Sequence, residues 1–230
     1  MEMKRVLLSC IMAIMSISMF AQKDVTTFLG IPVDGTKSEM KQKLIRKGFV
    51  PKKVGTNVFL KGEFNGTNVV VHIVTNNNKV YRLLLIDENT QSEADIKIRF
   101  NTLVSQFENN KRYTTFGEYT LSDEEDISYE MKAHNKIYEA IFYQVPKIEK
   151  VDASALYKKL NNELLSKYTE DELENPSEEI LKDINDTKMK ISNELLVKKT
   201  VWFRICENYG EYYIAMYYDN EYNCANGEDL

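Results

Sequence analysis

Hydrophobic and polar residues alternate with different periods along the chain, and each period predicts one kind of element. Between residues 37 and 47 the apolar residues recur at helical spacing, with Met40 and Leu44 on one face. A longer helix is predicted over residues 91–109 by the same spacing. Its apolar stripe consists of Ile96, Phe100, Leu103 and Phe107.

Alternating apolar and polar residues follow each of these helices and predict strands. The strands predicted after the first helix are NVFLKGEF (57–64), NVVVHIV (68–74) and VYRLLLI (80–86). The strands predicted after the second helix are YTTFGEYTL (113–121), ISYEMKA (127–133) and IYEAIFYQV (137–145). A two-residue turn at Asn65-Gly66, whose backbone matches strand twist, joins the first two. Each stretch therefore predicts one α-β-β-β unit.

Capping signals indicate where the helices begin and end. Thr36 and Thr90 each precede a glutamate by three positions, which predicts a capping box at both helix starts. The first helix is expected to end at Gly48, where a left-handed residue lets Phe49 fold back on Leu44.

Three short sequence pairs recur in the same order in the two stretches. They are TKSE (36–39) with TQSE (90–93), GEF (62–64) with GEY (117–119), and NKVY (78–81) with NKIY (135–138). Their offsets of 54, 55 and 57 residues indicate an internal repeat, with units of about 28–87 and 88–145. The alternative is that Asn-Lys before a β-branched residue is common turn chemistry.

One unit of this size buries too little surface to be stable alone. We therefore expect an α+β fold in which residues 22–145 form tandem α-β-β-β repeats that share one antiparallel sheet, with the helices on one face. Residues 146–199 are predicted to form a helical insertion, with one helix over 153–168. A second helix is predicted to be capped by Asn175, with Pro176 in its first turn and Glu178 at the capping-box position. The stripe of the second consists of Ile180, Ile184, Ile191 and Leu195. A dedicated partner-binding arm is the alternative to ordinary surface helices.

Residues 200–230 predict a C-terminal hairpin that completes the sheet, followed by a tail. The turn is expected at Asn208-Tyr209-Gly210, and strand alternation divides the hairpin into two faces. The face expected to be core carries Val201, Phe203, Ile205, Tyr212, Ile214, Met216 and Tyr218. The second face carries the candidate binding residues Trp202, Arg204, Tyr213 and Tyr217, which are residue types that dominate interface hot spots. The alternative is that these rings stabilise the sheet by cross-strand pairing.

The N-terminus, MEMKRVLLSCIMAIMSISMFAQ, places basic residues before a short apolar run and then turns polar. This pattern predicts a signal peptide over residues 1–21, cleaved after Ala21 or, alternatively, after Ser18. Lipid attachment at Cys10 is a further alternative. The apolar run is shorter than the roughly 20 residues that cross a bilayer. We therefore expect no integral membrane span and a periplasmic or secreted protein.

Composition argues against several partners and reactions. The chain has 30 basic and 35 acidic residues, a net charge of −5, whereas nucleic-acid binding requires a basic surface. With two histidines and no catalytic or phosphate-binding motif, no residue is proposed as catalytic or metal-ligating, and no cofactor is expected. We expect Cys206 and Cys224 to lie too far apart to pair, which leaves Cys206 as a buried thiol. The alternative is a disulfide between them in an oxidising compartment.

The segment LGIPVDGTKSEMKQKLIRKGF resembles the start of BamE-type outer-membrane assembly domains. The element order over residues 28–145 resembles the tandem-repeat fold of the β-lactamase inhibitory protein. The chain, with YYDN and NGEDL near its end, also looks like uncharacterised secreted proteins of Gram-negative anaerobes. These resemblances imply an extracytoplasmic binding module with a broad concave sheet. The helical region after Pro146 departs from the inhibitor pattern.

The resulting functional prediction is an exported, non-enzymatic protein that binds another protein or a cell-envelope polymer across its open sheet face. Two alternatives remain open at this point. One is a secreted hydrolase that uses two of the acidic residues as a carboxylate pair. The other is a structural component of the cell envelope.

Overall fold

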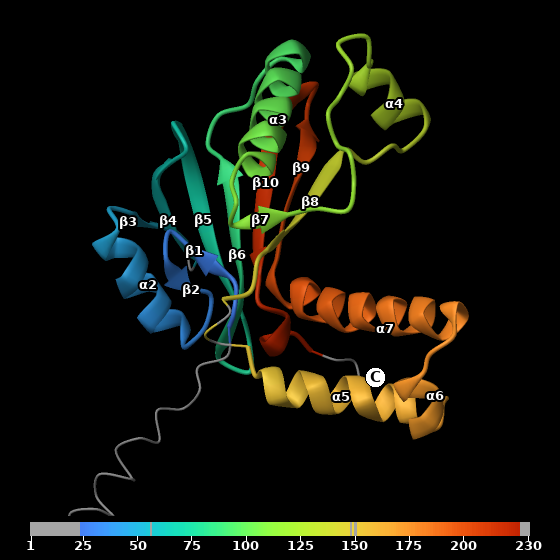
Figure 1. Ribbon diagram of the computed structural model, residues 1–230. Helices are drawn as coiled ribbons and strands as arrows, with labels where there is room; N and C mark the ends of the chain where they lie inside the picture. Colours follow the sequence, from blue (N-terminus) through green and yellow to red (C-terminus); the bar gives the residue numbers. More distant parts are fainter. Residues whose placement is uncertain (1–23, 56, 148, 150, 226–230) are drawn as a thin grey trace, which may run out of the picture.

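One antiparallel sheet organises the chain, and Figure 1 shows it in the computed structural model. The structure describes residues 24–55, 57–147, 149 and 151–225. Within these residues, eight strands follow the order β3-β4-β5-β6-β10-β9-β8-β7, and β1 and β2 form a separate hairpin. The strands are β1 Thr27–Phe28, β2 Ile31–Pro32, β3 Val50–Val54, β4 Asn57–Phe64, β5 Thr67–Asn76, β6 Lys79–Asp87, β7 Tyr113–Thr114, β8 Glu139–Gln144, β9 Thr200–Asn208 and β10 Glu211–Asp219.

Two helices pack against the same face of this sheet. Helix α2 (Lys37–Arg46) contacts β5 and β6, whereas α3 (Glu93–Glu108) contacts β9 and β10 (Figure 1). The α+β class, with one large antiparallel sheet, is therefore confirmed. The other helical elements are α4 Ile127–Ala133, α5 Ala153–Leu165, α6 Glu170–Glu174, α7 Glu178–Leu196 and the short 3-10 helices η2 Val197–Lys199 and η3 Glu221–Asn223.

Helix α2 begins and ends as the sequence predicts. The Thr36 hydroxyl accepts from the backbone N–H of Glu39 at 3.3 Å, and the Glu39 carboxylate accepts from the Thr36 N–H at 2.8 Å. These hydrogen bonds, the backbone one first, lower the pKa of Glu39. At the other end Gly48 has φ +97°, and the N–H of Phe49 donates back to the Leu44 carbonyl at 3.2 Å. The capping box and the glycine stop are both confirmed.

Helix α3 begins two residues later than predicted, and its cap is a different residue. Ser92, not Thr90, accepts a hydrogen bond from the third helical N–H, that of Asp95. The Glu93 carboxylate is instead used by the next helix, because it accepts from the N–H of Ile127 at 2.8 Å. The predicted apolar stripe of α3 is fully buried and faces the sheet.

Residues 127–133 form helix α4 and not the predicted strand. The sequence ISYEMKA alternates apolar and polar residues, but it also places Ile127 and Met131 four apart on one helical face. Asp126 caps the helix by accepting from the N–H of Tyr129 at 2.8 Å. Ile127 is buried whereas Tyr129 is 57% exposed, which fits the helical period. The preceding predicted strand, 113–121, is also wrong beyond Tyr113–Thr114.

The sheet contains one strand that the sequence did not predict, β3, at an edge where Pro51 and the neighbouring lysines are tolerated. Each half of the sheet thus has four strands, β3 to β6 and β7 to β10, and the last strand of each half lies at the centre. The second half therefore extends through the C-terminal hairpin and does not end at residue 145.

The NKVY segment lies at the β5–β6 turn but NKIY precedes β8, so these two segments occupy different places in their halves. The sequence repeat remains a prediction.

Residues 146–199 leave the sheet after β8 and return at its neighbour β9. Helices α5 and α7 pack against each other, and Figure 1 shows them projecting from one end of the sheet as a helical arm (153–196). The first predicted helix ends at Leu165 rather than residue 168, and α6 was not predicted. Of the predicted α7 stripe, Ile191 is buried and the others are half-buried. Ser177, and not the predicted Asn175, caps α7, because its hydroxyl accepts a hydrogen bond from the N–H of Ile180 at 3.3 Å.

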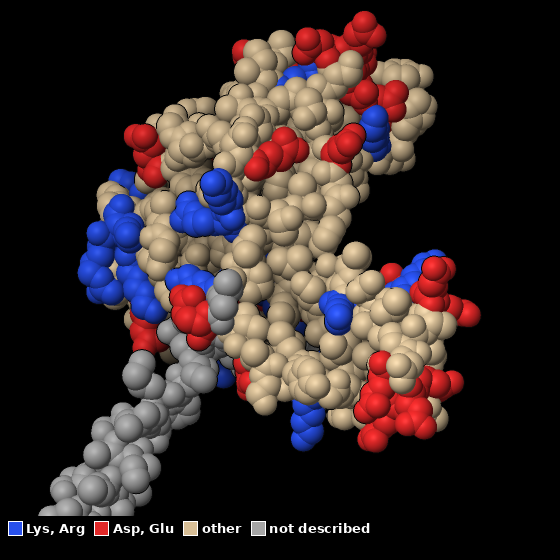
Figure 2. All heavy atoms as spheres, in the orientation of Figure 1, with Lys and Arg blue, Asp and Glu red and all other residues tan. Residues whose placement is uncertain are grey.

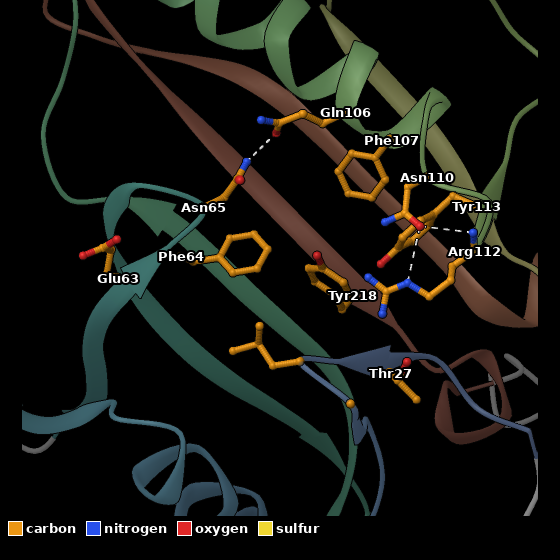
Figure 3. Close-up of a pocket in the computed structure, with 12 residues that line it drawn as sticks. Thr27, Glu63, Phe64, Asn65, Gln106, Phe107, Asn110, Arg112, Tyr113 and Tyr218 are labelled. Carbon is orange, nitrogen blue, oxygen red and sulfur yellow. Dashed lines mark hydrogen bonds between the residues drawn. The ribbon is translucent and has the colours of Figure 1, made fainter.

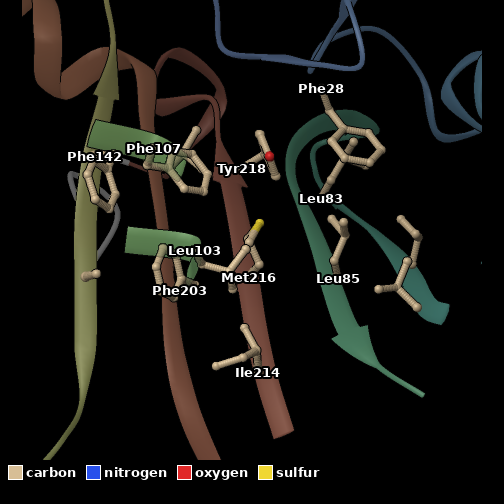
Figure 4. Packing of buried hydrophobic residues seen from close by; sticks show 14 of the residues in the cluster. Phe28, Leu83, Leu85, Leu103, Phe107, Phe142, Phe203, Ile214, Met216 and Tyr218 are labelled. Carbon is tan, nitrogen blue, oxygen red and sulfur yellow. The ribbon is translucent and has the colours of Figure 1, made fainter. Parts of the chain in front are cut away.

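Aromatic rings fill the space between the sheet and its helices (Figure 4). Phe107 of α3 stacks on Phe142 of β8 with ring centroids 4.8 Å apart. Phe28 of β1 meets Tyr218 of β10 edge-on at 4.9 Å. Fully burying one such ring contributes about 1.5–3 kcal/mol. The core side of the predicted hairpin is confirmed, because all seven residues assigned to it are buried.

A buried carboxylate lies at each end of the β6–β10 pairing. Asp87 of β6 accepts hydrogen bonds from Arg99 of α3 at 2.6 and 2.5 Å and from the N–H of Ile214 at 3.1 Å. Asp219 of β10 accepts from Arg82 of β6 at 2.6 and 2.7 Å. The side chains of the two aspartates are 2% and 3% exposed. The two ion pairs therefore tie the halves of the sheet to each other and to α3.

Replacing Arg99 with methionine is expected to lower the free energy of unfolding by about 3–5 kcal/mol, because it leaves the Asp87 carboxylate buried without its cation. The matched control is Lys61→Met, which breaks the neighbouring pair with Glu88, where both side chains are about one-third exposed. That variant should lose at most about 1 kcal/mol. Urea unfolding followed by the fluorescence of Trp202 measures both. Equal losses would contradict the structural role of the Asp87 pair.

Candidate functional site

The four candidate binding residues lie together on the outer face of the sheet, opposite α2 and α3. Tyr217 of β10 is directly across from Trp202 of β9, and Tyr213 is across from Cys206. Arg204 lies between them in the register, across from Ala215. Strand alternation thus presents all four on one surface, which we call the aromatic face (Trp202, Arg204, Tyr213, Tyr217).

Trp202 and Tyr217 form the rigid part of the aromatic face. Their rings stack with centroids 3.8 Å apart and an interplanar angle of 7°. The indole N–H of Trp202 donates to the Asp219 carboxylate at 2.9 Å, and the guanidinium of Arg82 lies 5.0 Å from the centre of the Tyr217 ring. Arg82 and Asp219 are also paired with each other, so the positions of the Trp202 and Tyr217 rings are fixed by contacts within the protein. Arg82 and Asp219 were not among the residues predicted for this face.

Arg204 differs from Arg82 because it has no acidic partner among the described residues. Its Nε atom is buried and makes no hydrogen bond. Glu139 of β8 lies across from Arg204 in the register, yet the two form no ion pair. Burial and the adjacent Cys206 raise the pKa of Tyr213, so its hydroxyl stays neutral and offers no counter-charge. A buried donor without a partner costs about 1–3 kcal/mol.

Apolar side chains extend the aromatic face to both sides. Val70, Val74, Leu84 and Ile86 continue it across β5 and β6, and Ile141 continues it across β8. All of these residues are half-buried. The helices α2 and α3 lie on the opposite face, so neither of them covers this surface (Figure 1). Strands were predicted for these residues, but their position on the same face as Trp202 was not.

Neither cysteine is paired in the structure. Cys206 is half-buried on the outer face, and not buried as predicted. Burial raises the pKa of the Cys224 thiol to about 11, which keeps it protonated at neutral pH.

Charge is separated over the molecule, a feature that the small net charge conceals. Figure 2 shows Lys and Arg side chains over α2 and β3, and Asp and Glu side chains over α4 and at the far end of the helical arm. The basic group consists of Lys37, Lys41, Lys43, Arg46, Lys47, Lys52 and Lys53. No ion pair neutralises any of these seven within the described residues. One end of the sheet is therefore positive.

A pocket of about 600 Å³ lies on the helix face, between the β1–β2 hairpin and the C-terminal end of α3 (Figure 3). Its lining includes Phe64, Phe107, Tyr113 and Tyr218 as aromatic walls and Arg112 as the single cation. The one carboxylate that lines it is Glu63. The elements that form it are far apart in the sequence, and the sequence analysis did not predict it.

Within the part of the chain that the structure describes, His, Cys, Asp and Glu side chains form no group of three that could hold a metal ion. None of the described helices is long and apolar enough to span a membrane. The predicted signal peptide (1–21) and residues 226–230 of the tail lie outside the described residues. Comparisons of the chain with protein-family models, with curated proteins and with solved structures each found no significant match.

The pKa of His72 is a measure of how apolar its surroundings on the outer face are. It lies beside Phe59, with ring centroids 5.9 Å apart, and burial first, then the charge of Lys37, lower its pKa below the usual 6.5. Because the folded-state pKa is the lower one, His72 costs no stability above pH 6.5, and its penalty grows as pH falls below that value. We expect an NMR titration midpoint below 6.5. His72→Gln should lose less stability than the native chain on acidification below pH 6.5. A midpoint at or above this value would contradict the apolar environment.

Proposed function

We propose that the chain is an exported, non-enzymatic protein that binds a partner protein through the outer face of its sheet. The observation that carries this proposal is Arg204, a partly buried cation without an acidic partner in the described structure, set among Trp202, Tyr213 and Tyr217. We infer that the partner places a carboxylate against Arg204 and an apolar side chain on the adjoining apolar surface.

Residue type and charge both favour a protein with an acidic contact surface. Tyr, Trp and Arg are enriched at hot spots because they combine large apolar area with a polar group. A planar guanidinium binds a carboxylate through two parallel hydrogen bonds, which fixes the geometry of the partner. The positive end of the sheet, formed by α2 and β3, would also speed the approach of an acidic partner. An anionic envelope polymer offers charge but fewer apolar groups for the neighbouring surface.

The prediction is tested by selecting displayed random peptides on the native chain after depletion on Arg204→Met. Enriched peptides should contain Asp or Glu beside an apolar residue, and their binding should change the fluorescence of Trp202, the single tryptophan. Affinity for Arg204→Met should be at least about tenfold lower, since a hydrogen bond to a charged group contributes about 1.5–3 kcal/mol.

The matched control is Arg46→Met, which removes an exposed arginine from α2 on the helix face. It should change affinity at most slightly. Peptides that bind the native chain and Arg204→Met equally would place the contact elsewhere. Binding of acidic polysaccharide, but of no peptide, would favour the polymer over a protein.

Export is tested separately by N-terminal sequencing of the protein recovered from outside the cytoplasm. The mature chain should begin at Gln22, or at Met19 if cleavage follows Ser18. Asp24 is expected to remain in the mature chain, because its carboxylate accepts from the N–H of Lys147 and from the ammonium of Lys199, both at 2.8 Å. Recovery of the intact chain only from the cytoplasm would contradict export.

A further inference from the structure

The pocket on the helix face is separate from the aromatic face, although both involve β10. Tyr218 lines the pocket, whereas its neighbour Tyr217 belongs to the aromatic face on the other side of the sheet. The mouth is held by a hydrogen bond of 2.5 Å from Asn65, in the β4–β5 turn, to Gln106 of α3. Figure 3 shows these two side chains reaching toward each other. The cavity thus forms where the two halves of the fold meet above the sheet.

Aromatic rings form the walls of this pocket. Phe107 meets Tyr113 edge-on, with centroids 4.7 Å apart, and Phe64 meets Tyr218 edge-on at 6.4 Å. Such walls favour a flat apolar group, which can contact ring faces and edges at once. A cavity of about 600 Å³ exceeds the volume of a single side chain and lies within the usual range for small-molecule sites.

One cation, Arg112, gives the pocket its polarity. Its Nε donates weakly to the Asn110 side-chain oxygen at 3.4 Å, and no carboxylate lies within ion-pair distance among the described residues. Figure 3 shows the guanidinium turned inward toward Tyr218. Burial, and then the adjacent Tyr113, raise the pKa of Tyr218 well above its ordinary value. Its hydroxyl therefore remains neutral and does not occupy the guanidinium as an anion.

We propose that this pocket binds a ligand in which an apolar ring carries a carboxylate. The ring would lie among Phe64, Phe107 and Tyr218, and the carboxylate would accept hydrogen bonds from Arg112. The same chemistry is presented by a small aromatic acid and by a peptide whose last residue is aromatic. Glu63, the one acidic lining residue, disfavours ligands with a second negative charge.

The test uses N-acetylphenylalanine as the probe, with binding followed by NMR amide shifts of the whole chain. Shifts should concentrate at Thr27, Asn110 and Tyr113 and leave β9 unchanged. N-acetylphenylalaninamide, which lacks the carboxylate, should bind at least about tenfold more weakly. N-acetylalanine, which lacks the ring, should also bind more weakly. Phenylacetate and a tripeptide ending in phenylalanine distinguish the two sources by their relative affinities.

Arg112→Met should weaken binding of N-acetylphenylalanine at least about tenfold, and Arg112→Lys should restore only part of it because lysine lacks the planar fork. The matched control is Lys111→Met, because Lys111 is exposed like Arg112 but does not line the pocket. Trp202→Phe should leave pocket binding unchanged, which separates this site from the aromatic face. Equal affinity of native chain and Arg112→Met, or no saturable shifts at the lining residues, would overturn the proposal.

Discussion

The pairing of β6 with β10 is the interaction on which the rest of the structure depends. The two strands lie far apart in the sequence, at residues 79–87 and 211–219, and five consecutive residue pairs join them, from Ala215 with Ile86 to Asp219 with Arg82. Without this pairing each half would be a separate four-stranded sheet with one helix, too small to bury its apolar residues well. The carboxylates at its two ends connect the strand pair to other groups, because Asp87 accepts a hydrogen bond from Arg99 of α3 and Asp219 accepts one from Trp202. Both the core face and the outer face therefore depend on the β6–β10 pairing.

The central position of β10 also explains why the molecule has two candidate sites, one on the helix side of the sheet and one on the outer side. Strand alternation along β10 sends Tyr218 to the helix side and Tyr217 to the outer side. On the helix side, α2 and α3 cover different strand pairs, and the pocket lies near the line where their coverage meets. On the outer side neither α2 nor α3 adds a layer, and there Trp202 and Arg204 are half-buried, whereas Tyr217 is buried with 9% of its surface exposed. Each site has one arginine without an acidic partner in the described structure, and this separates Arg112 and Arg204 from the paired Arg82 and Arg99.

Sequence periodicity predicted the elements well where one period was unambiguous. The α3 stripe and the alternation of the C-terminal hairpin were predicted directly. The structure adds that a two-residue turn, Tyr209-Gly210, places Tyr217 across from Trp202. ISYEMKA fits both the strand period and the helix period. It is a helix in the structure, where Asp126 caps it and the distant Glu93 accepts a hydrogen bond from its first N–H. The strand order, and with it the pocket, depends on which distant strands pair. No local pattern contains that information, so Arg82, Asp219 and Arg112 could not be assigned to their sites from sequence.

The edges of the sheet argue that a partner approaches its face and not its rim. At one edge, β3 carries Pro51 and two lysines, which oppose addition of another strand. At the other edge, β7 pairs with only Tyr143 and Gln144 of β8. The chain then continues along the same edge, where the hydroxyl of Thr115 donates to the carbonyl of Ile141 at 2.8 Å and Phe116 packs on Tyr143. Both edges are thus occupied or protected, whereas the apolar surface around Arg204 is half-buried and is not covered by α2 or α3. Recognition by side chains across that surface is the mode that this architecture favours over strand addition.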